Sequence, residues 1–285
     1  MKFSYYPGCS GHTTGIEYNQ STQAVFEALE IDLVELGDWN CCGASSAHMT
    51  NWLLALALPA RNLAIAQEAG LDLVMPCAAC FNRHKVADHA IRTNPEQRQA
   101  IEEVVEVQFT APAAVRVPLD VIYNEVGLDR VKGMVKRPLA GLKVVPYYGC
   151  LLVRPPEVTQ FENPDHPTFM AELLEVLGAE VKPWSYATDC CGGALSLTKT
   201  DMVAHMVGRL MERAREAGAE ALVTACPLCQ MNLEMRQADG NKMPILYFTE
   251  LMGLAFGLPD TGKWWGKHLI SPVPYLSQCG LIQSV

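Results

Sequence analysis

Apolar and polar positions along the chain form short strand-like runs that alternate with longer helical stretches. The second half repeats the order of the first, so each half begins with a strand, continues into a helix and returns to a strand. The predicted strands are residues 2–6, 32–36, 143–145 and 180–184, and the predicted helices are residues 21–29 and 168–177. Strands that alternate with helices of this length are typical of βαβ units. The pattern therefore predicts an α/β fold with mostly parallel sheets.

Three further segments have distinct patterns. Residues 52–66 are the most apolar stretch and predict a buried helix, because the run falls short of the ~20 residues that cross a bilayer. We therefore predict no membrane span. Asp201 is expected to cap a helix that Gly218 ends. The charged segment 93–111 occurs only in the first half and predicts an exposed helix followed by a loop.

Composition narrows the class of protein. Hydrophobic residues make up 49% of the 285 residues and charged residues 19%, which is typical of a compact globular protein. The 22 basic and 31 acidic residues give a net charge of −9, which disfavours nucleic acid and anionic membranes as partners. Residues 1–8 lack the apolar run of a signal peptide, so a cytoplasmic location is expected. In that reducing compartment, clustered cysteines are more often metal ligands or redox groups than disulfides.

Ten of the eleven cysteines form two equivalent sets. Each set consists of a single cysteine, then an adjacent pair, then a Cys-x-x-Cys. The first gap is 31 residues in one set and 39 in the other, whereas the second gap is 34 in both. The sets are Cys9, Cys41, Cys42, Cys77 and Cys80, and Cys150, Cys190, Cys191, Cys226 and Cys229. Cys279 lies outside both sets and is expected to be an ordinary thiol.

The surroundings of the cysteines repeat as well. Residues 5–9 (Tyr-Tyr-Pro-Gly-Cys) parallel residues 146–150 (Pro-Tyr-Tyr-Gly-Cys), and a glycine follows each cysteine pair, at Gly43 and at Gly192. Such internal repetition indicates two copies of one structural unit. We therefore expect two pseudo-symmetric domains, residues 1–137 and 138–285, that pack closely together.

The chemistry of five cysteines per set points to a group of several metal atoms. Thiolates select zinc, copper(I) or iron–sulfur clusters, and a structural zinc site uses only four ligands. Neighbouring side chains in an extended segment point to opposite sides, so the two cysteines of each pair should contact different metal atoms. Gly43, Gly192 and Gly193 allow the backbone to approach such a group closely and are candidate cofactor-binding residues.

The spacing of the ten cysteines resembles the CCG-domain signature, and two copies in a chain of this length resemble the B subunit of heterodisulfide reductases. The resemblance implies two Rossmann-like repeats with one noncubane 4Fe–4S cluster each. It assigns the five cysteines of each set as ligands of that set's cluster. An older view of this family places zinc in one of the two motifs, so zinc in one site stays an alternative.

The same resemblance implies the reaction and the partners. The reaction is reductive cleavage of a disulfide, CoM-S-S-CoB or a related heterodisulfide, lying between the two clusters. This chain has no ferredoxin-type motif, so its electrons are expected from an iron–sulfur C subunit. A flavin-containing A subunit that can perform electron bifurcation would feed that iron–sulfur protein, with a hydrogenase or dehydrogenase as a further partner.

One alternative function and four candidate contacts complete the expectations. The alternative is a CCG-type electron-transfer subunit of a quinone-linked system that oxidises lactate, glycolate or glycerol 3-phosphate. His12, His48, Arg154 and Lys199 follow motif cysteines and are candidate proton donors or substrate contacts. Core packing or a solvated surface position is the competing interpretation for each of the four.

Overall fold

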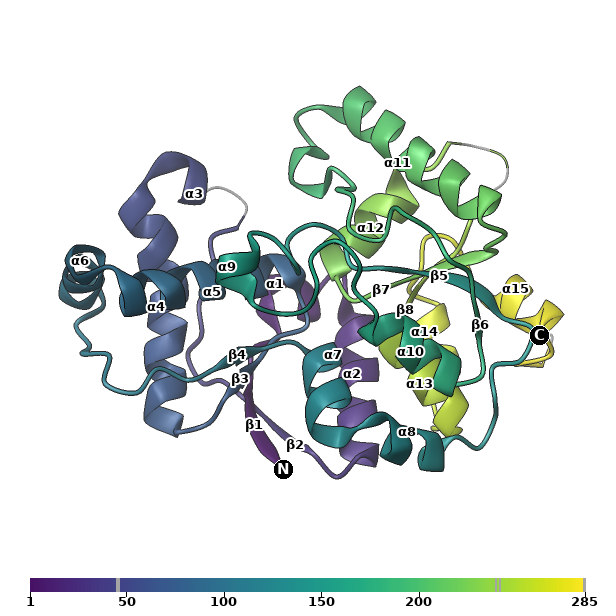
Figure 1. The fold of residues 1–285 in the computed structure, drawn as a ribbon, viewed down its shortest axis with the longest axis horizontal. Coiled ribbons are helices and arrows are strands. Elements are labelled where there is room, and N and C mark those ends of the chain that lie inside the picture. The colour runs from purple at the N-terminus through teal and green to yellow at the C-terminus, as the bar shows by residue number, and fades with distance from the viewer. Residues whose placement is uncertain (45–46, 239, 241, 284–285) are drawn as a thin grey trace.

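The computed structural model describes residues 1–44, 47–238, 240 and 242–283. In this part of the chain, the strands form two four-stranded sheets in which every neighbouring pair of strands is parallel. Figure 1 shows the two sheets in separate halves of the molecule, with helices packed around them. The predicted α/β class with two repeats is confirmed.

The first repeat contains four strands in the order β2-β1-β3-β4. The strands are β1 (Lys2–Tyr5), β2 (Asp32–Glu35), β3 (Leu73–Val74) and β4 (Val115–Arg116). The helices are α1 (Gly8–Gly11), α2 (Ile16–Ala28), α3 (Ala47–Thr50), α4 (Trp52–Ala69), α5 (Ala78–Thr93), α6 (Pro95–Val105), α7 (Pro118–Asp120), the π-helix η1 (Val121–Val126) and α8 (Leu128–Met134).

The second repeat has the same topology, with the strand order β6-β5-β7-β8. Its strands are β5 (Lys143–Tyr147), β6 (Glu180–Val181), β7 (Ala221–Thr224) and β8 (Ile245–Tyr247). The helices are α9 (Pro156–Thr159), α10 (Phe169–Val176), the 3-10 helix η2 (Gly193–Leu195), α11 (Thr200–Glu216), α12 (Pro227–Met235), α13 (Phe248–Phe256), α14 (Thr261–Trp265) and α15 (Val273–Gln278).

Three local predictions differ from the structure. The predicted strand over 180–184 ends at Val181 because Pro183 cannot donate to the ladder. Asp201 does not cap α11, because the helix starts at Thr200 and Asp201 lies in its first turn. There the acidic side chain interacts favourably with the helix dipole. The helix over 52–66 exists as α4, but it is not buried throughout, since Trp52 at its start is 57% exposed. The other predicted helices and strands are present with shifted ends.

The two repeats share one hydrophobic core. Helix α2 of the first repeat packs against α13 of the second, where the Ser21 and Thr249 hydroxyls lie 2.7 Å apart. Beside them, the rings of Tyr18 and Tyr247 stack with their centroids 4.3 Å apart. The larger cluster of buried apolar residues includes members of both repeats, and a second, smaller cluster lies within the second repeat. The predicted close packing of the two halves is therefore present.

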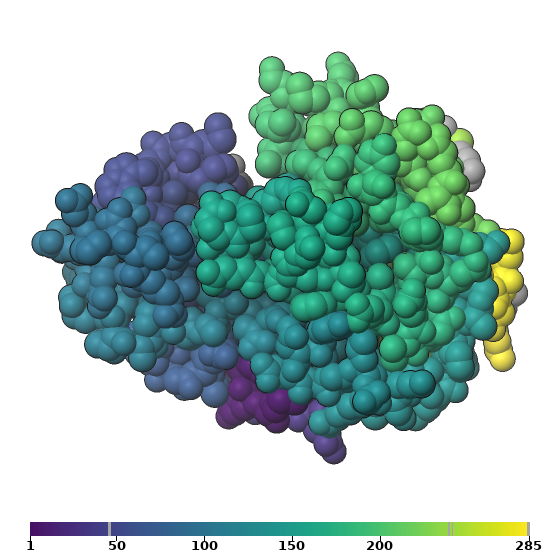
Figure 2. All heavy atoms as spheres, in the orientation of Figure 1, coloured from purple at the N-terminus to yellow at the C-terminus, as the bar shows by residue number. Residues whose placement is uncertain are grey.

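The outer surface is notched between the repeats. Figure 2 shows the notch at the top of the molecule, between the purple-blue lobe near residue 50 and the bright green lobe near residue 200. These lobes contain α3 and the start of α11, which follow the two cysteine pairs in the chain. No helix among the described residues is both long and apolar enough to cross a bilayer.

Candidate metal centre

All ten patterned cysteines lie at the carboxyl ends of parallel strands. In the first repeat they occupy the segments that follow β1, β2 and β3, and in the second repeat those that follow β5, β6 and β7. In each sheet the strand that comes first in the chain, β1 or β5, lies between the next two strands of its repeat. The next two strands are therefore added on opposite sides of it. Ligands of open α/β sheets bind at this switch point. The fold thus brings three distant stretches of each repeat to one edge.

Within each set, sulfur atoms lie in contact. The Sγ atoms of Cys42 and Cys80 are 3.4 Å apart, and those of Cys191 and Cys229 are 3.7 Å apart. These two pairs are equivalent in the two repeats, so the sets share this part of their sulfur arrangement.

The adjacent pairs point in two directions, as their sequence predicts. Cys41 and Cys190 are exposed, whereas Cys42 and Cys191 are buried at 2% and 4% exposure. One sulfur of each pair thus faces the interior of the set and the other faces its rim. A group held by both would have to extend from the interior toward the surface.

In each set, neighbouring thiols stabilise one cysteine as a thiolate, which is the form that binds metal. Hydrogen bonds from Cys41 and Cys80 lower the pKa of Cys42 to about 3. The hydrogen bond from Cys150 lowers the pKa of Cys190 to about 6. The pKa values of the donors Cys41 and Cys150 are raised for the same reason. Each set therefore contains a ready thiolate next to protonated partners.

The two sets meet at the amino ends of two helices. Cys77 and Cys226 occupy the N-cap positions of α5 and α12, and the interaction of their thiols raises the pKa of Cys77 and helps to lower that of Cys226. The backbone amide of Ala78 also donates to Cys226, across the boundary between the repeats. Pro227 is the first residue of α12, a position that proline favours. Two positive helix ends therefore face the place where the sets join.

Glycines fit the close spacing around the sulfurs. Gly8 has φ +65°, and a Cβ on it would lie 3.2 Å from the Cys80 sulfur. Gly149 has φ +67°, and a Cβ there would lie 3.2 Å from the Cys229 sulfur. These two residues were not among the predicted cofactor-binding glycines, although both precede the first cysteine of a set.

The three predicted glycines contribute in a different way. Their backbone amides lie against the cysteine pairs, because Gly43 donates to Cys41, Gly192 to Cys190 and Gly193 to Cys191. Gly43 and Gly192 also have positive φ values of 74° and 79°. A Cβ on Gly43 would meet Ala47 and Leu58, and one on Gly192 would meet Val203 and Met206. These glycines therefore allow tight packing of the loops and bring N–H donors to the sulfurs.

Two equivalent tyrosines support the loops that carry the cysteine pairs. The Tyr6 hydroxyl donates to the carbonyl of Asn40 at 2.9 Å, and the Tyr147 hydroxyl donates to the carbonyl of Asp189 at 2.7 Å. Each carbonyl belongs to the residue just before a cysteine pair. Burial raises the pKa of both tyrosines, so they stay protonated donors. The tyrosines repeat in the sequence, but only the structure shows what they bind.

The candidate histidines lie outside the sulfur clusters. His12 is half exposed, stacks on Trp39 and lies 3.2 Å from the Glu35 carboxylate. His48 is exposed on α3. A third histidine, His84, is fully buried and bonds the carbonyl of Cys80 at 2.8 Å, and burial lowers its pKa. His84 therefore acts as a packed neutral side chain below the first set.

The candidate cations are not gathered around the sulfurs. Arg154 binds the carbonyl of Pro164 and the carboxylate of Asp165, both at 2.9 Å, on the surface. Lys199 is exposed at the start of α11. Cys279 lies near the carbonyl of Gly141, apart from both sets.

The donor set fits a group larger than one ion. Among the described residues, no three side chains of the kind that bind metals converge as ligands of a single ion. Instead, the five cysteines of each set lie in the three segments that follow neighbouring strands, together with backbone amides and a helix amino end. Amide donors and helix dipoles compensate the negative charge that several thiolates concentrate. The residues present therefore fit an iron–sulfur group.

Together, fold and site define a class: an α/β protein of two repeats, each with five cysteines at the carboxyl edge of its sheet. The model of the cysteine-rich domain named CCG matches residues 3–83 and 144–234. The chain belongs to this CCG family and contains two copies of its domain.

Relatives that match most of the chain carry oxidoreductase names. A protein of Wolinella succinogenes, the 8-methylmenaquinol:fumarate reductase membrane anchor subunit, is 32% identical over 90% of this chain and 93% of its own. An Archaeoglobus profundus protein, named as similar to the B subunit of heterodisulfide reductase, is 30% identical over 90% and 91%. The B subunit of the ferredoxin/F420H2-dependent CoB-CoM heterodisulfide reductase of Methanosarcina acetivorans is 28% identical over 97% and 96%. The resemblance to the B subunit of heterodisulfide reductases is thereby confirmed, and with it an oxidoreductase role that uses iron–sulfur groups.

A solved structure shares the fold. The crystal structure of a hypothetical protein from Helicobacter pylori matches with a TM-score of 0.69 at 12% identity. The match covers 92% of this chain and 50% of the other. At this identity the likeness concerns the fold alone.

Proposed function

We propose that the chain is the catalytic subunit of a heterodisulfide reductase complex and cleaves a disulfide reductively between two noncubane 4Fe–4S clusters. The observation that supports this most directly is the proximity of Cys77 and Cys226, whose thiols shift each other's pKa, because it brings two equivalent five-cysteine groups together. Each group then offers a metal site to one sulfur of a disulfide. The name of the Methanosarcina relative suggests CoM-S-S-CoB or a related heterodisulfide as the substrate.

In this proposal, the five cysteines of each set hold one cluster. Bound there, the clusters supply two electrons singly and iron atoms that can bind the separated sulfurs. The protein supplies the rest: Gly43, Gly192 and Gly193 direct amides at the sulfurs, and α5 and α12 direct their amino ends. Zinc in one of the sets is the alternative that metal analysis decides.

The four candidate contacts would act at the rim rather than between the sets. His12 is the strongest of them, since it lies on the turn that follows Cys9 and its ring is half exposed. His48, Arg154 and Lys199 are exposed or engaged elsewhere and would meet a substrate only on the outer surface. The protons that two thiols require are therefore assigned to His12 or to water.

The partners follow from the electron supply. Among the described residues, Cys279 is the one cysteine outside the two sets. A further cysteine-bound cluster would therefore have to belong to another protein. We infer an iron–sulfur C subunit, fed by a flavin-containing A subunit with a hydrogenase or dehydrogenase behind it. Eleven free cysteines suit the reducing cytoplasm. We place the domain boundary between residues 137 and 138, in the connection from α8 to β5.

A quinone-linked electron-transfer subunit is the second candidate function. The relative from Wolinella succinogenes favours it, because that protein is named for a menaquinol:fumarate reductase and matches over nearly its whole length. In this case the same sulfur sets would pass electrons toward a quinone-reactive partner and would cleave no disulfide.

One comparison separates the two candidates. The anaerobically prepared chain is reduced with a viologen dye, and oxidation of the dye is followed after addition of CoM-S-S-CoB, of a small-molecule disulfide or of a soluble menaquinone analogue. The reductase proposal predicts dye oxidation with a disulfide and release of two thiols per two electrons. Oxidation by the quinone alone would contradict it and favour the second candidate.

A further inference from the structure

Two segments of the second cysteine set are held by side chains of the first repeat. The set occupies three segments, which follow β5, β6 and β7. The first and the third of these segments lie at the boundary between the repeats, where α5 packs against α9 and α1 packs against α12. The side chains that donate hydrogen bonds to them across this boundary are Asn82 on α5 and Tyr18 on α2.

Asn82 fixes the turn that contains Cys150. The carbonyl of Cys150 accepts the backbone amide of Arg154 at 3.0 Å, so the residues between them form a tight turn. The side-chain amide of Asn82 donates to two carbonyls of this turn, that of Leu151 at 3.1 Å and that of Arg154 at 2.8 Å. Asn82 is 2% exposed and lies two residues after Cys80 on α5. A cysteine turn of the second set is therefore fixed by the helix that carries a cysteine of the first.

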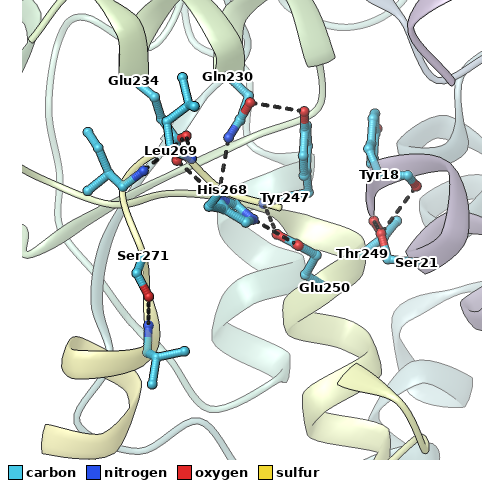
Figure 3. Close-up of polar contacts among 12 residues, drawn as sticks. Tyr18, Ser21, Gln230, Glu234, Tyr247, Thr249, Glu250, His268, Leu269 and Ser271 are labelled. Atoms are coloured by element: carbon cyan, nitrogen blue, oxygen red, sulfur yellow. Dashed lines mark hydrogen bonds and ion pairs between the residues drawn. The ribbon is translucent and has the colours of Figure 1, made fainter. Parts of the chain in front are cut away.

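Tyr18 supports the segment that contains Cys226. Its hydroxyl donates at 3.2 Å to the carbonyl of Ala225, the residue between β7 and Cys226. Its ring stacks on that of Tyr247 at the end of β8, and Figure 3 shows the two rings side by side. The Tyr18 side chain is buried, so water does not compete for these contacts. A second segment of the same set thus depends on the first repeat.

The backbone of the first repeat also approaches α12 closely. A Cβ on Gly15, the residue before α2, would lie 2.7 Å from the Cβ of Pro227, the residue after Cys226. The amide of Gly15 donates to the carbonyl of Ser10 at 2.9 Å, which fixes the turn that follows the first cysteine of the chain. There is consequently no room at this point for the two repeats to shift toward each other.

The first cysteine set receives its equivalent contacts from its own repeat. The Thr13 hydroxyl donates to the carbonyl of Cys9 at 2.7 Å, and the side-chain amide of Asn62 donates to the carbonyl of Asn40 at 2.9 Å. The backbone amide of Asn40 in turn donates to the Asn62 side chain at 3.0 Å. Within the described part of the chain, the loops of the first set are thus held locally, whereas two loops of the second set are held from the other repeat.

We propose that Asn82 and Tyr18 are positioning residues that complete the second cysteine set, so that this set binds its iron–sulfur group only when the first repeat is packed against it. Each residue acts through the backbone beside a cysteine, since Leu151 follows Cys150 and Ala225 precedes Cys226. Loss of a group that orients a metal ligand typically lowers metal affinity about 10–100-fold. This inference rests on the proposed iron–sulfur function.

The test is Asn82→Leu, which keeps the approximate size of the side chain and removes its donor. The unchanged chain and the variant are loaded with iron and sulfide without oxygen and treated with iodoacetamide, and the modified cysteines are identified by mass spectrometry. In the variant we expect Cys150 and Cys190 to be modified at least about tenfold faster, because the second set loses its group. Cys9 and Cys41 should stay protected, and iron should fall from about eight to about four atoms per chain.

The matched control is Met231→Leu. Met231 lies two residues after Cys229, as Asn82 lies two residues after Cys80, and its thioether has no hydrogen to donate. We expect Met231→Leu to keep full iron and full protection of both sets. If Asn82→Leu does not fold, as judged by circular dichroism, Tyr18→Phe decides, because it keeps the stacked ring and removes only the hydroxyl. The same selective modification of the second set is expected there.

The pattern of modification separates positioning from a merely structural role. Equal modification of both sets would show a general loss of structure and would overturn the inference, as would full protection of the second set in both Asn82→Leu and Tyr18→Phe. Loss of protection in Met231→Leu to the same extent would also contradict it. Iron and sulfide of the unchanged chain are assayed first. A chain without them contradicts the proposed function and this inference together, whereas a loaded chain whose variants stay protected contradicts the inference alone.

Discussion

The thiols of Cys77 and Cys226 are close enough to shift each other's pKa although the two residues are 149 positions apart in the sequence. They are the same position in the two repeats, at the N-cap of α5 and of α12. The two sulfur sets are therefore neighbours at the boundary between the repeats, and this arrangement underlies the predictions below.

Loss of the inner cysteine of a pair should affect one set and spare the other. Cys191→Ala removes the buried sulfur that lies 3.7 Å from Cys229. We expect iron to fall from about eight to about four atoms per chain, and disulfide-dependent oxidation of reduced dye to cease. Iron analysis and the dye assay check this. Cys279→Ala, outside both sets, should keep full iron and activity, whereas full activity in Cys191→Ala would rule out its set as an active ligand group.

The glycines before the first cysteine of each set should tolerate no side chain. Gly8→Ala and Gly149→Ala place a Cβ 3.2 Å from a cysteine sulfur at a positive φ. We expect both variants to bind about half the normal iron, since each disturbs one set. Gly208→Ala is the control, because it has open space around its Cβ position within α11. It should raise the free energy of unfolding by about 0.5–1 kcal/mol without changing the iron content.

The hydroxyl groups of the equivalent residues Tyr6 and Tyr147 should contribute to the stability of the fold. Tyr6→Phe and Tyr147→Phe keep the buried ring and remove the hydroxyl that donates to the carbonyl of Asn40 or Asp189. The Asn40 carbonyl keeps the side-chain amide of Asn62 as a donor at 2.9 Å. We expect the free energy of unfolding to fall by about 1–3 kcal/mol in Tyr147→Phe, because a partly buried acceptor loses its donor, and by less in Tyr6→Phe. Urea denaturation of the metal-free chain measures this. Equal stability of both variants and the unchanged chain would show that the hydroxyls do not support the cysteine loops.

The repeated cysteine pattern predicted the two-unit architecture and the candidate ligands. Equal gaps before Cys77 and Cys226 predicted two copies of one unit, and the α/β order followed from strands at matching places. The hydrogen bonds of Tyr6 and Tyr147 could not be predicted from the sequence, because a repeated tyrosine does not show which carbonyl its hydroxyl binds. Helix ends also shifted: Asp201 has the chemistry of a cap, but Thr200 already belongs to α11.

The environment of His268 could not be predicted, because the residues that form it share no repeat and no motif. Its imidazole lies between Glu234 and Glu250, 3.0 Å from each carboxylate. The three residues come from separate segments of the chain, and each alone has the pattern of a helix or loop residue exposed to water. Only the packing of α12, α13 and the segment after α14 brings them together.

The stability of the chain should decrease toward alkaline pH because of His268. Its pKa is about 10 in the folded chain, above the ordinary value near 6.5, so folding favours the protonated imidazole. This contribution is fully present below pH 6.5 and is lost as the pH rises through 10. Denaturation at several pH values should show a decline from about pH 7 to about pH 10. His268→Gln should lower stability at pH 7 by about 3–5 kcal/mol and flatten that decline, and an equally steep decline in the variant would contradict the assignment.

The central claim, that a disulfide is cleaved between two iron–sulfur groups, is tested most directly by an anaerobic crystal structure of the iron-loaded chain soaked with a heterodisulfide. We predict two four-iron groups, one bound by each five-cysteine set on either side of Cys77 and Cys226, with one sulfur of the substrate at each group. Zinc ions at the cysteines, or iron–sulfur groups with the disulfide intact and bound elsewhere, would contradict this claim.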